Sequence, residues 1–388
     1  MPVSKRTAEQ QQLPASIKPY WVSECGRATI YLGDCREVMS QMEPYQFHAV
    51  VTDPPYGLGK EPDVAQVMAS WVRCGHHEVG GGGFMGKKWD AFVPQPTTWK
   101  ECVKVMKPGA HMVCFAGTRT LDWMTMALRF VGLECRDLVM WVHSQGFPKG
   151  IDVSKAIYKK SGDKQSAERW EGWNTALKPS VEPIILARKP ISGTVADCVV
   201  THETGAINVD ACRVGDIDNL GLKTGHNIKS SGTGIYCFNR RGTGLAAMNG
   251  DFVQRQVKGR WPANVLHDGS DEVLKLFPES YSHGESGSAA RFFYTTKADD
   301  SDRPHGEGTV LHLTVKPIDL MQYLIRLVCV KGGVVLDPFM GSGSTGCAAI
   351  LEGVRFVGIE QSKEYADIAV GRLNLALIQR KVTGAPSA

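Results

Sequence analysis

The stretch VVLDPFMGSGSTG, residues 334–346, predicts an apolar β-strand that ends at Asp337, a glycine-rich loop and the first turn of a helix. Glycines allow a backbone to approach a ligand closely, and the N-terminus of a helix offers free N–H groups. Glu360 ends the next predicted strand, where a carboxylate can accept hydrogen bonds from ribose hydroxyls. The glycines match the spacing G-x-G-x-x-G of dinucleotide-binding loops, but no lysine follows them as a P-loop requires. This segment therefore predicts a site for a cofactor that contains a nucleoside.

The position of this segment in the chain predicts a circular permutation. Only 28 residues follow Glu360, too few to supply the remaining strands of a cofactor-binding α/β sheet. The missing strands are expected in the N-terminal half, where predicted strands and helices alternate as in a largely parallel sheet. The strands are expected at 28–32, 47–52, 111–116 and 137–143, and the helices at 35–42, 98–106 and 121–131.

A second motif, Asp53-Pro54-Pro55-Tyr56, follows the buried strand predicted at 47–52. Two prolines make this turn stiff, and they hold a carboxylate and backbone carbonyls as hydrogen-bond acceptors beside an aromatic ring. Such a pocket suits the exocyclic amine of a planar base. The alternative is a turn that merely ends a strand, and the presence of the cofactor loop in the same chain argues against it.

Two long segments interrupt the alternation of strands and helices. Residues 57–96 are rich in Gly and Pro without sustained periodicity, which predicts a long mobile loop, and loops of this length are usually functional or disordered. Residues 191–310 are rich in Gly, Ser, Asn, Asp and Arg, which predicts a separate module or a large insertion. Its window 223–260 holds seven basic residues and one acidic residue, a balance of +6. Such a window either faces solvent or binds a nucleic acid.

The composition is that of a globular protein. The 388 residues are 43% hydrophobic and 22% charged, and their net charge of +4 only weakly favours a nucleic-acid partner. No apolar stretch is long enough to span a membrane, and the first residues contain no apolar signal segment. The eleven cysteines include no C-x-x-C pair, which favours reduced thiols in a cytoplasm. Cys74, His76 and His77 lack a usual zinc spacing, so no metal site is predicted.

The order of the motifs resembles that of the amino-methylating DNA methyltransferases, which modify N6 of adenine or N4 of cytosine, in the permuted arrangement called the β class. The resemblance covers nearly the whole chain and is closest to phage-type and solitary bacterial enzymes. Besides the two motifs above, the similar stretches are Gly33-Asp34-Cys35, 83–90 (GFMGKKWD), 146–149 (GFPK), 176–179 (ALKP) and 259–264 (GRWPAN).

This resemblance implies a circularly permuted Rossmann-like α/β fold that binds S-adenosylmethionine (AdoMet). The catalytic half of the methyltransferase domain is then expected at 1–190, with the mobile loop at 57–96. A target-recognition region is expected at 191–310, and the AdoMet-binding half of the domain at 311–388.

The resemblance also implies which residues contact AdoMet. Asp34 and Cys35 are expected near its adenine, and Glu360 near its ribose. Thr314 and Lys316 are expected near its methionine end. The loop that lies against AdoMet contributes Asp337, Pro338, Phe339, Gly341, Ser342, Gly343 and Ser344.

The second motif implies methyl transfer to an amine. The lone pair of an aromatic amine is delocalised into its ring, so Asp53 and a carbonyl of Pro54 or Pro55 are expected to accept its N–H bonds and free the lone pair for in-line attack. Tyr56 is expected to stack on a base flipped out of a duplex. An aspartate at position 53 favours adenine N6, because enzymes of this type that act on cytosine N4 more often carry serine there.

The expected partner is double-stranded DNA. Neither a membrane nor an obligatory protein partner is expected, and the sequence leaves open whether the protein forms a homodimer. The expected location is the cytoplasm of a bacterial cell or phage host, in association with the nucleoid. Lys88 and Trp89 are expected to clamp DNA or the flipped base. The other expected DNA contacts are Asn239, Arg240, Arg241, Arg255, Lys258 and Arg260. Two other classes stay open, an NAD-linked oxidoreductase and a non-catalytic DNA-binding regulator.

Overall fold

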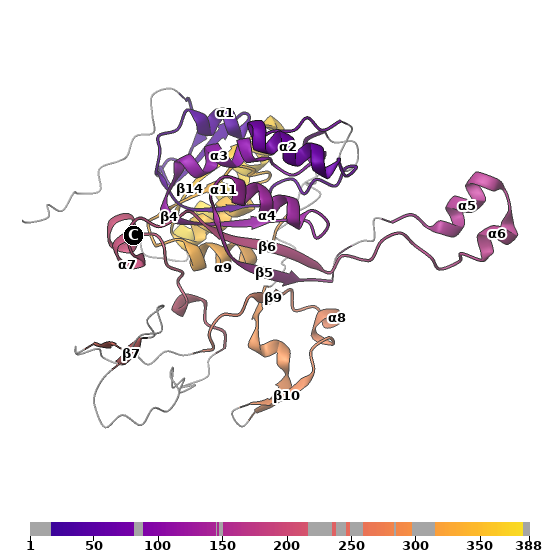
Figure 1. Cartoon of the computed structure of the whole chain (residues 1–388). Helices are drawn as coiled ribbons and strands as arrows, with labels where there is room; N and C mark the ends of the chain where they lie inside the picture. The colour runs from indigo at the N-terminus through magenta and orange to yellow at the C-terminus, as the bar shows by residue number, and fades with distance from the viewer. Residues whose placement is uncertain are drawn as a thin grey trace, which may run out of the picture.

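A ten-stranded mixed β-sheet forms the centre of the computed structural model (Figure 1). The structure describes residues 17–80, 88–144, 146, 150–215, 235–237, 246–248, 259–282, 285–296 and 315–382. The strand order is β1-β2-β14-β13-β3-β4-β6-β5-β9-β12. The bounds are β1 Trp21–Val22, β2 Ala28–Leu32, β3 Phe47–Thr52, β4 Met106–Phe115, β5 Glu134–Val142, β6 Val181–Arg188, β9 Val265–His267, β12 Tyr294–Thr295, β13 Val334–Asp337 and β14 Arg355–Glu360.

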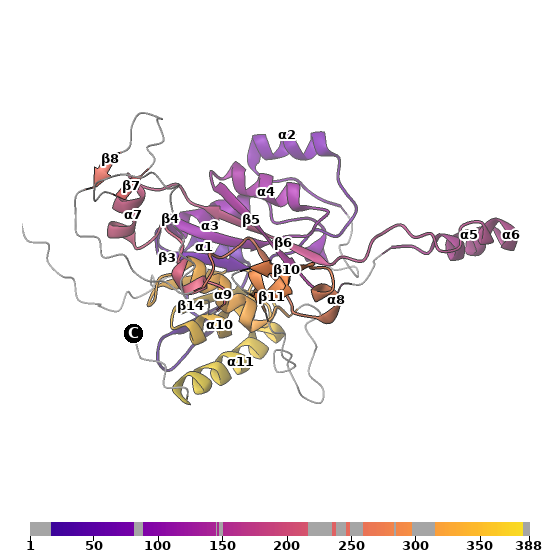
Figure 2. The same ribbon diagram turned by 90° about the horizontal axis from the view of Figure 1, so that it is seen from below.

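Helices cover both faces of this sheet (Figures 1 and 2). One layer consists of α1 Cys35–Ser40, α2 Val64–Cys74, α3 Pro96–Val105 and α4 Leu121–Phe130. The other layer consists of α9 Ile318–Val328, α10 Ser344–Glu352 and α11 Lys363–Val382. The remaining helices and hairpin strands are α5 Val153–Ser161, α6 Lys164–Glu168, α7 Val195–His202, α8 Asp271–Leu274, β7 Ile235–Cys237, β8 Ala246–Met248, β10 Glu279–Ser282 and β11 Glu285–Ser288.

The C-terminal strands lie in the interior of the sheet. β13 lies between β14 and β3 and is parallel to both, with Leu336 beside Val357 on one side and Val50 on the other. β2 and β4 continue the parallel set beyond β14 and β3. The two ends of the chain therefore build one sheet, and the predicted circularly permuted α/β fold is confirmed.

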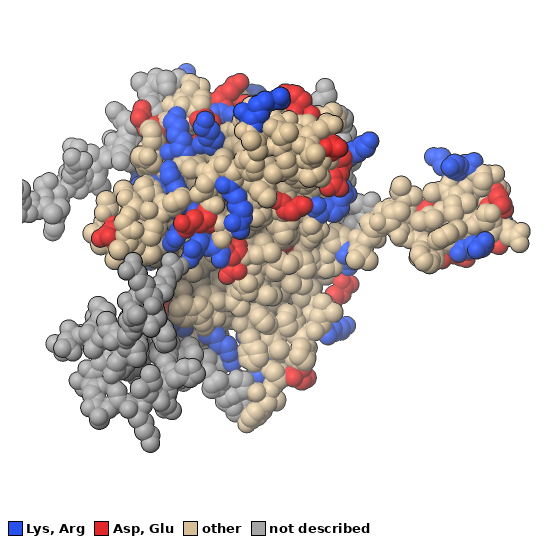
Figure 3. All heavy atoms as spheres, in the orientation of Figure 1, with Lys and Arg blue, Asp and Glu red and all other residues tan. Residues whose placement is uncertain are grey.

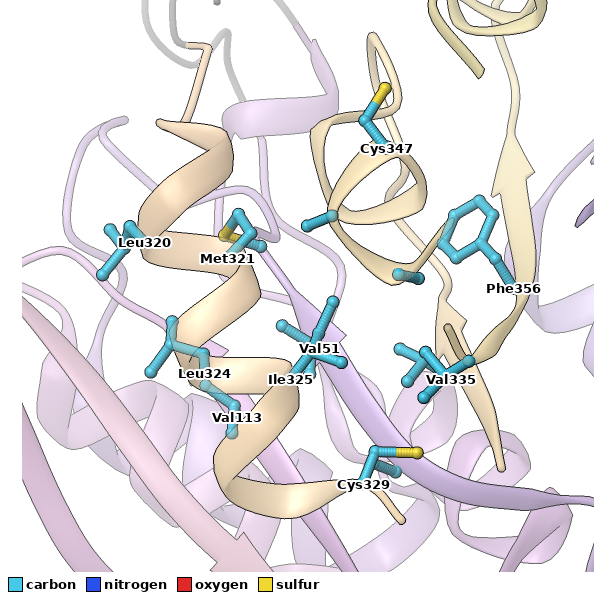
Figure 4. Close-up of a cluster of buried hydrophobic side chains, with 14 of the residues drawn as sticks. Val51, Val113, Leu320, Met321, Leu324, Ile325, Cys329, Val335, Cys347 and Phe356 are labelled. Carbon is cyan, nitrogen blue, oxygen red and sulfur yellow. The ribbon is translucent and has the colours of Figure 1, made fainter. Parts of the chain in front are cut away.

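Alternating strand side chains fill two apolar layers. Val51 and Val113 belong to the layer under α9, where Met321 and Ile325 lie in the same cluster (Figure 4). Val50, the neighbour of Val51, belongs to the opposite layer with α1, α3 and α4. Central parallel strands are buried on both faces, which explains why their sequences are continuous apolar runs rather than alternating ones.

The expectation of one continuous loop at 57–96 is wrong for Val64–Cys74, which form the helix α2. Asp63 caps its N-terminus with its side chain, and Gly75 ends it in the left-handed conformation. Sequence analysis missed this helix because its apolar face is short and its flanks are rich in Gly and Pro. Its fully buried side chains are Val67 and Trp71.

Parts of the segment 191–310 join the central sheet. β9 pairs with β5, and β12 pairs with β9, so both extend the sheet at one edge. Between β5 and β6, the short helices α5 and α6 form an arm that projects away from the body of the molecule (Figures 1 and 2). Basic and acidic side chains are interspersed over the face drawn in Figure 3, and this arm carries both signs.

Three findings concern the described part of the chain alone. No helix there is long and apolar enough to cross a membrane. No group of three or more potential metal ligands gathers among these residues. Ten cysteines that the structure describes are free thiols.

Candidate active site

The candidate site lies at the edge of the sheet where the parallel strands end. Asp53 directly follows β3, and Asp337 and Glu360 end β13 and β14. The strand β6 is antiparallel to β4 and β5, so its second residue, Glu182, reaches the same edge from the opposite direction. Ligands of open α/β sheets bind at this edge. The topology therefore brings the predicted catalytic motif and the predicted cofactor loop to one place.

Asp53 and three other polar side chains form a cluster. Lys316 Nζ lies 2.9 Å from Asp53 Oδ2 and 3.0 Å from Glu182 Oε2. The Tyr56 hydroxyl lies 2.8 Å from Asp53 Oδ1 and 3.1 Å from Glu182 Oε2. The side chain of Lys316 is only 8% exposed, and its ammonium also faces the Tyr56 and Phe115 rings. One buried lysine therefore holds two carboxylates.

These charges shift one another's pKa values. Burial raises the pKa of Asp53, Lys316 opposes the rise, and Glu182 adds to it. Burial would also raise the pKa of Glu182, but attraction to Lys316 and hydrogen bonds lower it below its usual range. Burial and the two carboxylates raise the pKa of the Tyr56 hydroxyl well above its usual range. At neutral pH, Tyr56 therefore keeps its proton, and Glu182 carries a negative charge.

Residues beyond the motif stabilise the turn from Asp53 to Tyr56 by hydrogen bonds. Thr120 Oγ1 donates a hydrogen bond to the Tyr56 carbonyl oxygen at 2.5 Å, and the Gly57 N–H donates to Asp90 Oδ1 at 3.0 Å. Gly57 has a φ of +69°, and a Cβ at this position would lie 2.6 Å from the nitrogen of Val93. Only glycine fits this conformation and this space. The Tyr56 backbone is thus fixed at the site.

The side chain of Asp337 connects the glycine loop to the neighbouring strand β3 by hydrogen bonds. It is buried, and its Oδ1 accepts hydrogen bonds from Thr52 Oγ1 at 2.7 Å and from the Phe339 N–H at 3.1 Å. Its Oδ2 accepts from Thr345 Oγ1 at 2.6 Å. Burial raises the pKa of Asp337 to about 6, although these hydrogen bonds oppose the rise. Because Thr52 ends β3, these bonds tie the glycine loop to the strand that carries Asp53.

The serines of the loop are also engaged inside the protein. Arg372 of α11 donates to Ser342 Oγ at 2.9 Å and to Ser344 Oγ at 3.1 Å. Gly341 and Gly343 have φ angles of +54° and +85°, which favour glycine. What this loop offers to a ligand is therefore its backbone at the N-terminus of α10.

Glu360 offers free acceptor capacity beside this loop. Its Oε2 accepts a hydrogen bond from the Gly341 N–H at 2.9 Å, and its Oε1 accepts from the Ser362 N–H at 2.8 Å. A carboxylate has about four acceptor sites, so about two remain for the hydroxyls of a ribose. Burial raises the pKa of Glu360 above its usual value. The donor and acceptor set fits a cofactor that carries a nucleoside.

Asp34 and Cys35 lie at the next strand end. The Gly33 N–H donates to the Glu360 carbonyl oxygen at 2.9 Å, which places the start of α1 beside β14. Asp34 caps α1 by accepting from the Arg36 N–H at 2.8 Å, and it also pairs with the Arg36 guanidinium. Burial raises the pKa of the Cys35 thiol to about 12, so this thiol stays protonated.

The remaining cofactor-loop residues support the same edge. The ring of Phe339 packs edge to face against Trp99 of α3, with ring centroids 5.9 Å apart. Pro338 is buried. Lys316 faces Asp53 and Glu182, while Thr314, its predicted partner near the methionine end of AdoMet, lies outside the described residues.

Three of the eight predicted DNA contacts fall on described residues. Lys88 and Trp89 belong to a short 3-10 helix, Lys88–Asp90, and the Trp89 side chain is 53% exposed. The guanidinium of Arg260 lies over the ring of Phe292, 4.5 Å from its centroid. The other five lie outside the described residues: Asn239, Arg240, Arg241, Arg255 and Lys258.

Sequence analysis missed one residue of this edge, Glu182, whose neighbour is His143. His143 directly follows β5, and its Nε2 lies 3.7 Å from Glu182 Oε1, where it is buried and has no hydrogen-bond partner among the residues that the structure describes. The available signal was an acidic residue inside the otherwise apolar stretch VEPIILA at 181–187. A charged residue in a buried strand usually has a partner or a function.

Comparison with known proteins identifies relatives across most of the chain. Type II methyltransferase M.HindIII of Haemophilus influenzae is 24% identical over 366 residues, which cover 89% of this chain and 95% of that protein. DNA adenine methyltransferase YhdJ of Escherichia coli is 43% identical over 65 residues, 17% of this chain and 22% of that protein. Among solved structures, the cytosine-N4-specific PvuII DNA methyltransferase is 13% identical, with a TM-score of 0.49 and coverage of 95% of this chain and 97% of that chain.

A family model described as DNA methylase, N6_N4_Mtase, matches residues 47–371. The matched range contains Asp53 and the glycine loop, as well as Glu182 and Lys316 between them. AdoMet is the methyl donor of such enzymes, and the acceptor set around Glu360 fits it. The chain belongs to the N6_N4 family of DNA methylases.

Proposed function

We propose that this protein is a site-specific DNA methyltransferase that transfers the methyl group of AdoMet to N6 of adenine in a flipped-out base. One observation carries the proposal: Asp53 stands at the end of β3, and Thr52, the residue before it, is hydrogen-bonded to Asp337 of the cofactor half. An acceptor for an amine and a loop for a nucleoside cofactor thus share one strand edge. YhdJ, which is 43% identical over a segment of 65 residues, is named a DNA adenine methyltransferase, and this name supports adenine as the target.

The residues of the turn prepare the amine for attack. Asp53 accepts one N–H of the exocyclic amine, and the carbonyl of Pro54 or Pro55 accepts the other. Both bonds draw electron density toward the nitrogen, and they hold its lone pair in line with the methyl group. The ring of Tyr56 supports the face of the flipped base by stacking. AdoMet supplies the methyl group as a sulfonium, so the nitrogen–carbon bond forms as the carbon–sulfur bond breaks and a neutral thioether leaves.

The direct test is the chemical identity of the product. Duplex DNA is incubated with the protein and AdoMet, digested to nucleosides and analysed by mass spectrometry. N6-methyladenine is expected. If N4-methylcytosine is detected instead, the target is cytosine N4, the second candidate. If no methylated nucleoside is detected, the result favours the alternative of a non-catalytic DNA-binding protein.

The variant Asp53→Ala tests the assigned role of the carboxylate. Methyl transfer should fall below detection, while AdoMet affinity measured by calorimetry stays within about twofold, because Asp53 acts on the amine and not on the cofactor. Asp367→Ala serves as the control, since Asp367 is an exposed residue of α11 paired with Lys363. Full turnover by Asp53→Ala would refute the assignment.

Target choice is assigned to the segment 191–310. Arginine side chains can read a guanine edge with two hydrogen bonds or hold a phosphate, and the two roles differ in measurement. Replacing a phosphate contact weakens binding to all sequences, whereas replacing a base contact costs about 1 to 3 kcal/mol and relaxes one position of the site. Alanine at Arg240, Arg241 and Arg255 should impair DNA methylation with AdoMet affinity unchanged. If all three variants keep both DNA affinity and the methylated motif, recognition lies elsewhere.

A further inference from the structure

Glu182 is a partly buried carboxylate, 23% exposed, that the reaction described above does not use. It is the second residue of β6, the strand that reaches the site edge in the antiparallel direction. Its Oε2 lies 3.0 Å from Lys316 Nζ and 3.1 Å from the Tyr56 hydroxyl. Asp53 contacts the same two groups, at 2.9 and 2.8 Å. Glu182 and Asp53 therefore share both of their donors.

The donors that Asp53 and Glu182 share allow the Tyr56 hydroxyl to change its acceptor when a substrate amine binds. Tyr56 has one O–H, which can be donated to Asp53 or to Glu182 but not fully to both. When the amine of a base donates its N–H to Asp53, the Tyr56 hydroxyl can turn to Glu182 without losing a partner. Without Glu182, Asp53 would have to accept the Tyr56 hydroxyl, the Lys316 ammonium and the substrate amine at the same time, so the hydroxyl would share its acceptor with the substrate.

The sharing also sets the charge of the site. With the carboxylates ionised, Asp53 and Lys316 alone would be neutral, whereas Asp53, Glu182 and Lys316 together carry one net negative charge. The attacking amine becomes positively charged as its new bond forms, and a preorganised negative charge stabilises that transition state. Three further titratable groups surround the cluster. They are Cys114 on β4, His143 after β5 and Asp337 at the end of β13.

Neither Cys114 nor His143 supplies charge to the site at neutral pH. Burial raises the pKa of the Cys114 thiol well above its usual range, so it stays neutral. Burial lowers the pKa of His143, although Glu182 and Asp268 oppose this, so the ring is neutral as well. Asp337 lies at the same edge and interacts with Asp53 electrostatically, but its carboxylate oxygens are engaged by Thr52 and Thr345.

We propose that Glu182 is a second functional carboxylate of the methyl-transfer site: it takes over the Tyr56 hydroxyl when the amine binds Asp53, and it gives the site the negative charge that the methylated amine needs. This inference rests on the proposed function. The methylated amine must lose one proton to become the neutral product, and that proton passes from the nitrogen to Asp53. Glu182 acts through Tyr56 and Lys316 and does not touch the substrate, so it is a positioning residue.

The test compares two substitutions that separate shape from charge. Glu182→Gln keeps the length and the acceptor oxygen but removes the charge, and Glu182→Asp keeps the charge but shortens the side chain. Single-turnover methylation of duplex DNA is measured against pH, with AdoMet affinity and thermal unfolding as checks. Glu182→Gln should be about 10- to 100-fold slower at its plateau, less than the roughly 100- to 1000-fold loss for a group that contacts the developing charge directly, because Glu182 acts through Tyr56 and Lys316. Glu182→Asp should be faster than Glu182→Gln.

The pH profile gives a second signature. Glu182 is one cause of the raised pKa of Asp53, so its neutralisation should move the acid limb of the rate profile to lower pH. A purely structural glutamate would leave that limb in place, and the isosteric glutamine would then be better tolerated than aspartate. Glu134→Gln is the matched control, because Glu134 begins β5 and pairs with Arg188, which ends β6, at the opposite end of the same strand pair.

The outcomes separate this inference from the proposed function. A wild-type protein that transfers no methyl group to DNA contradicts the proposed function itself. A wild-type protein that does transfer it, with a Glu182→Gln variant of unchanged rate and unchanged acid limb, overturns only the role of Glu182. If Glu182→Gln does not fold, Glu182→Asp decides, because a rate below one-hundredth of wild type with the charge retained contradicts the proposal.

Discussion

Replacing Lys316 by methionine should make the stability of this protein strongly dependent on pH. Lys316 is almost fully buried and contacts the carboxylates of Asp53 and Glu182 at 2.9 and 3.0 Å. Methionine can fill the apolar space beside the Phe115 ring, so packing is largely preserved. What the substitution removes is the buried cation between two partly buried carboxylates.

The expected magnitude follows from these contacts. Removing one partner of a buried ion pair costs about 3 to 5 kcal/mol, because the remaining charge is left without compensation. Asp53 and Glu182 can escape part of this cost by binding a proton. Their pKa in the folded variant lies above that of the unfolded chain, so the folded state binds more protons and the stability of the variant rises as pH falls. The loss should therefore be about 3 to 5 kcal/mol at pH 8 and clearly smaller at pH 5.5.

The assay is urea unfolding of the wild type and the variant at both pH values. Differences between the two proteins at each pH cancel the titration of all groups outside the cluster. The double variant Lys316→Met with Glu182→Gln should lose less than the sum of its single substitutions, because one of the two unpaired charges is gone. Lys363→Met is the control, since Lys363 is 68% exposed and its pair with Asp367 contributes little.

Two results would refute this reasoning. A loss below about 1 kcal/mol at pH 8 would mean that the two carboxylates do not depend on Lys316. An equal loss at both pH values would mean that the destabilisation comes from packing rather than from charge.

Three further predictions concern other parts of the fold. Glu360→Ala should weaken AdoMet binding about 10- to 150-fold, the scale of charge-assisted hydrogen bonds, and unchanged affinity in calorimetry would place the ribose elsewhere. Burial lowers the pKa of His111 to about 4, so the unfolded state binds its proton first and the stability from this neutral ring is lost as pH falls below about 6.5. The free energy of unfolding of the wild type relative to His111→Gln should fall by about 2 to 3 kcal/mol from pH 7 to 4.5, and a constant difference would contradict the burial of a neutral ring. Gly346→Ala should lower the free energy of unfolding in urea by about 1 to 3 kcal/mol, because its Cβ would lie 2.7 Å from the Phe356 ring. Gly371→Ala is the control and should not destabilise the protein, because the space around Gly371 is open. Equal effects of the two substitutions would refute the packing argument.

Part of the site could be predicted from the chain because its determinants are local. The strand, glycine loop and helix at 334–346 follow from hydrophobic pattern and backbone freedom, and the structure has β13 and α10 there. The stiff turn at Asp53 follows from two prolines after an apolar strand. The permuted order follows from the number of residues after Glu360, and the interior position of β13 and β14 confirms it.

Other features depended on directions and distances that an apolar pattern does not encode. The stretch 181–188 forms the strand β6, but hydrophobicity does not encode which way a strand runs, and only the antiparallel direction of β6 brings Glu182 to the catalytic edge. The helix α2 was not predicted, because its buried face is short and the flanking residues are rich in Gly and Pro.

The sequence by itself determined the fold class, the cofactor loop and the acceptor turn, because each is written in consecutive residues whose backbone preferences act locally. Only the tertiary structure decided which charges share a site. Lys316 and Glu182 come from distant parts of the chain and meet Asp53 through the packing of β3 and β6 on either side of β4. The physical reason is that burial makes each of these charges dependent on the others, and burial is a property of the folded sheet rather than of any segment in it.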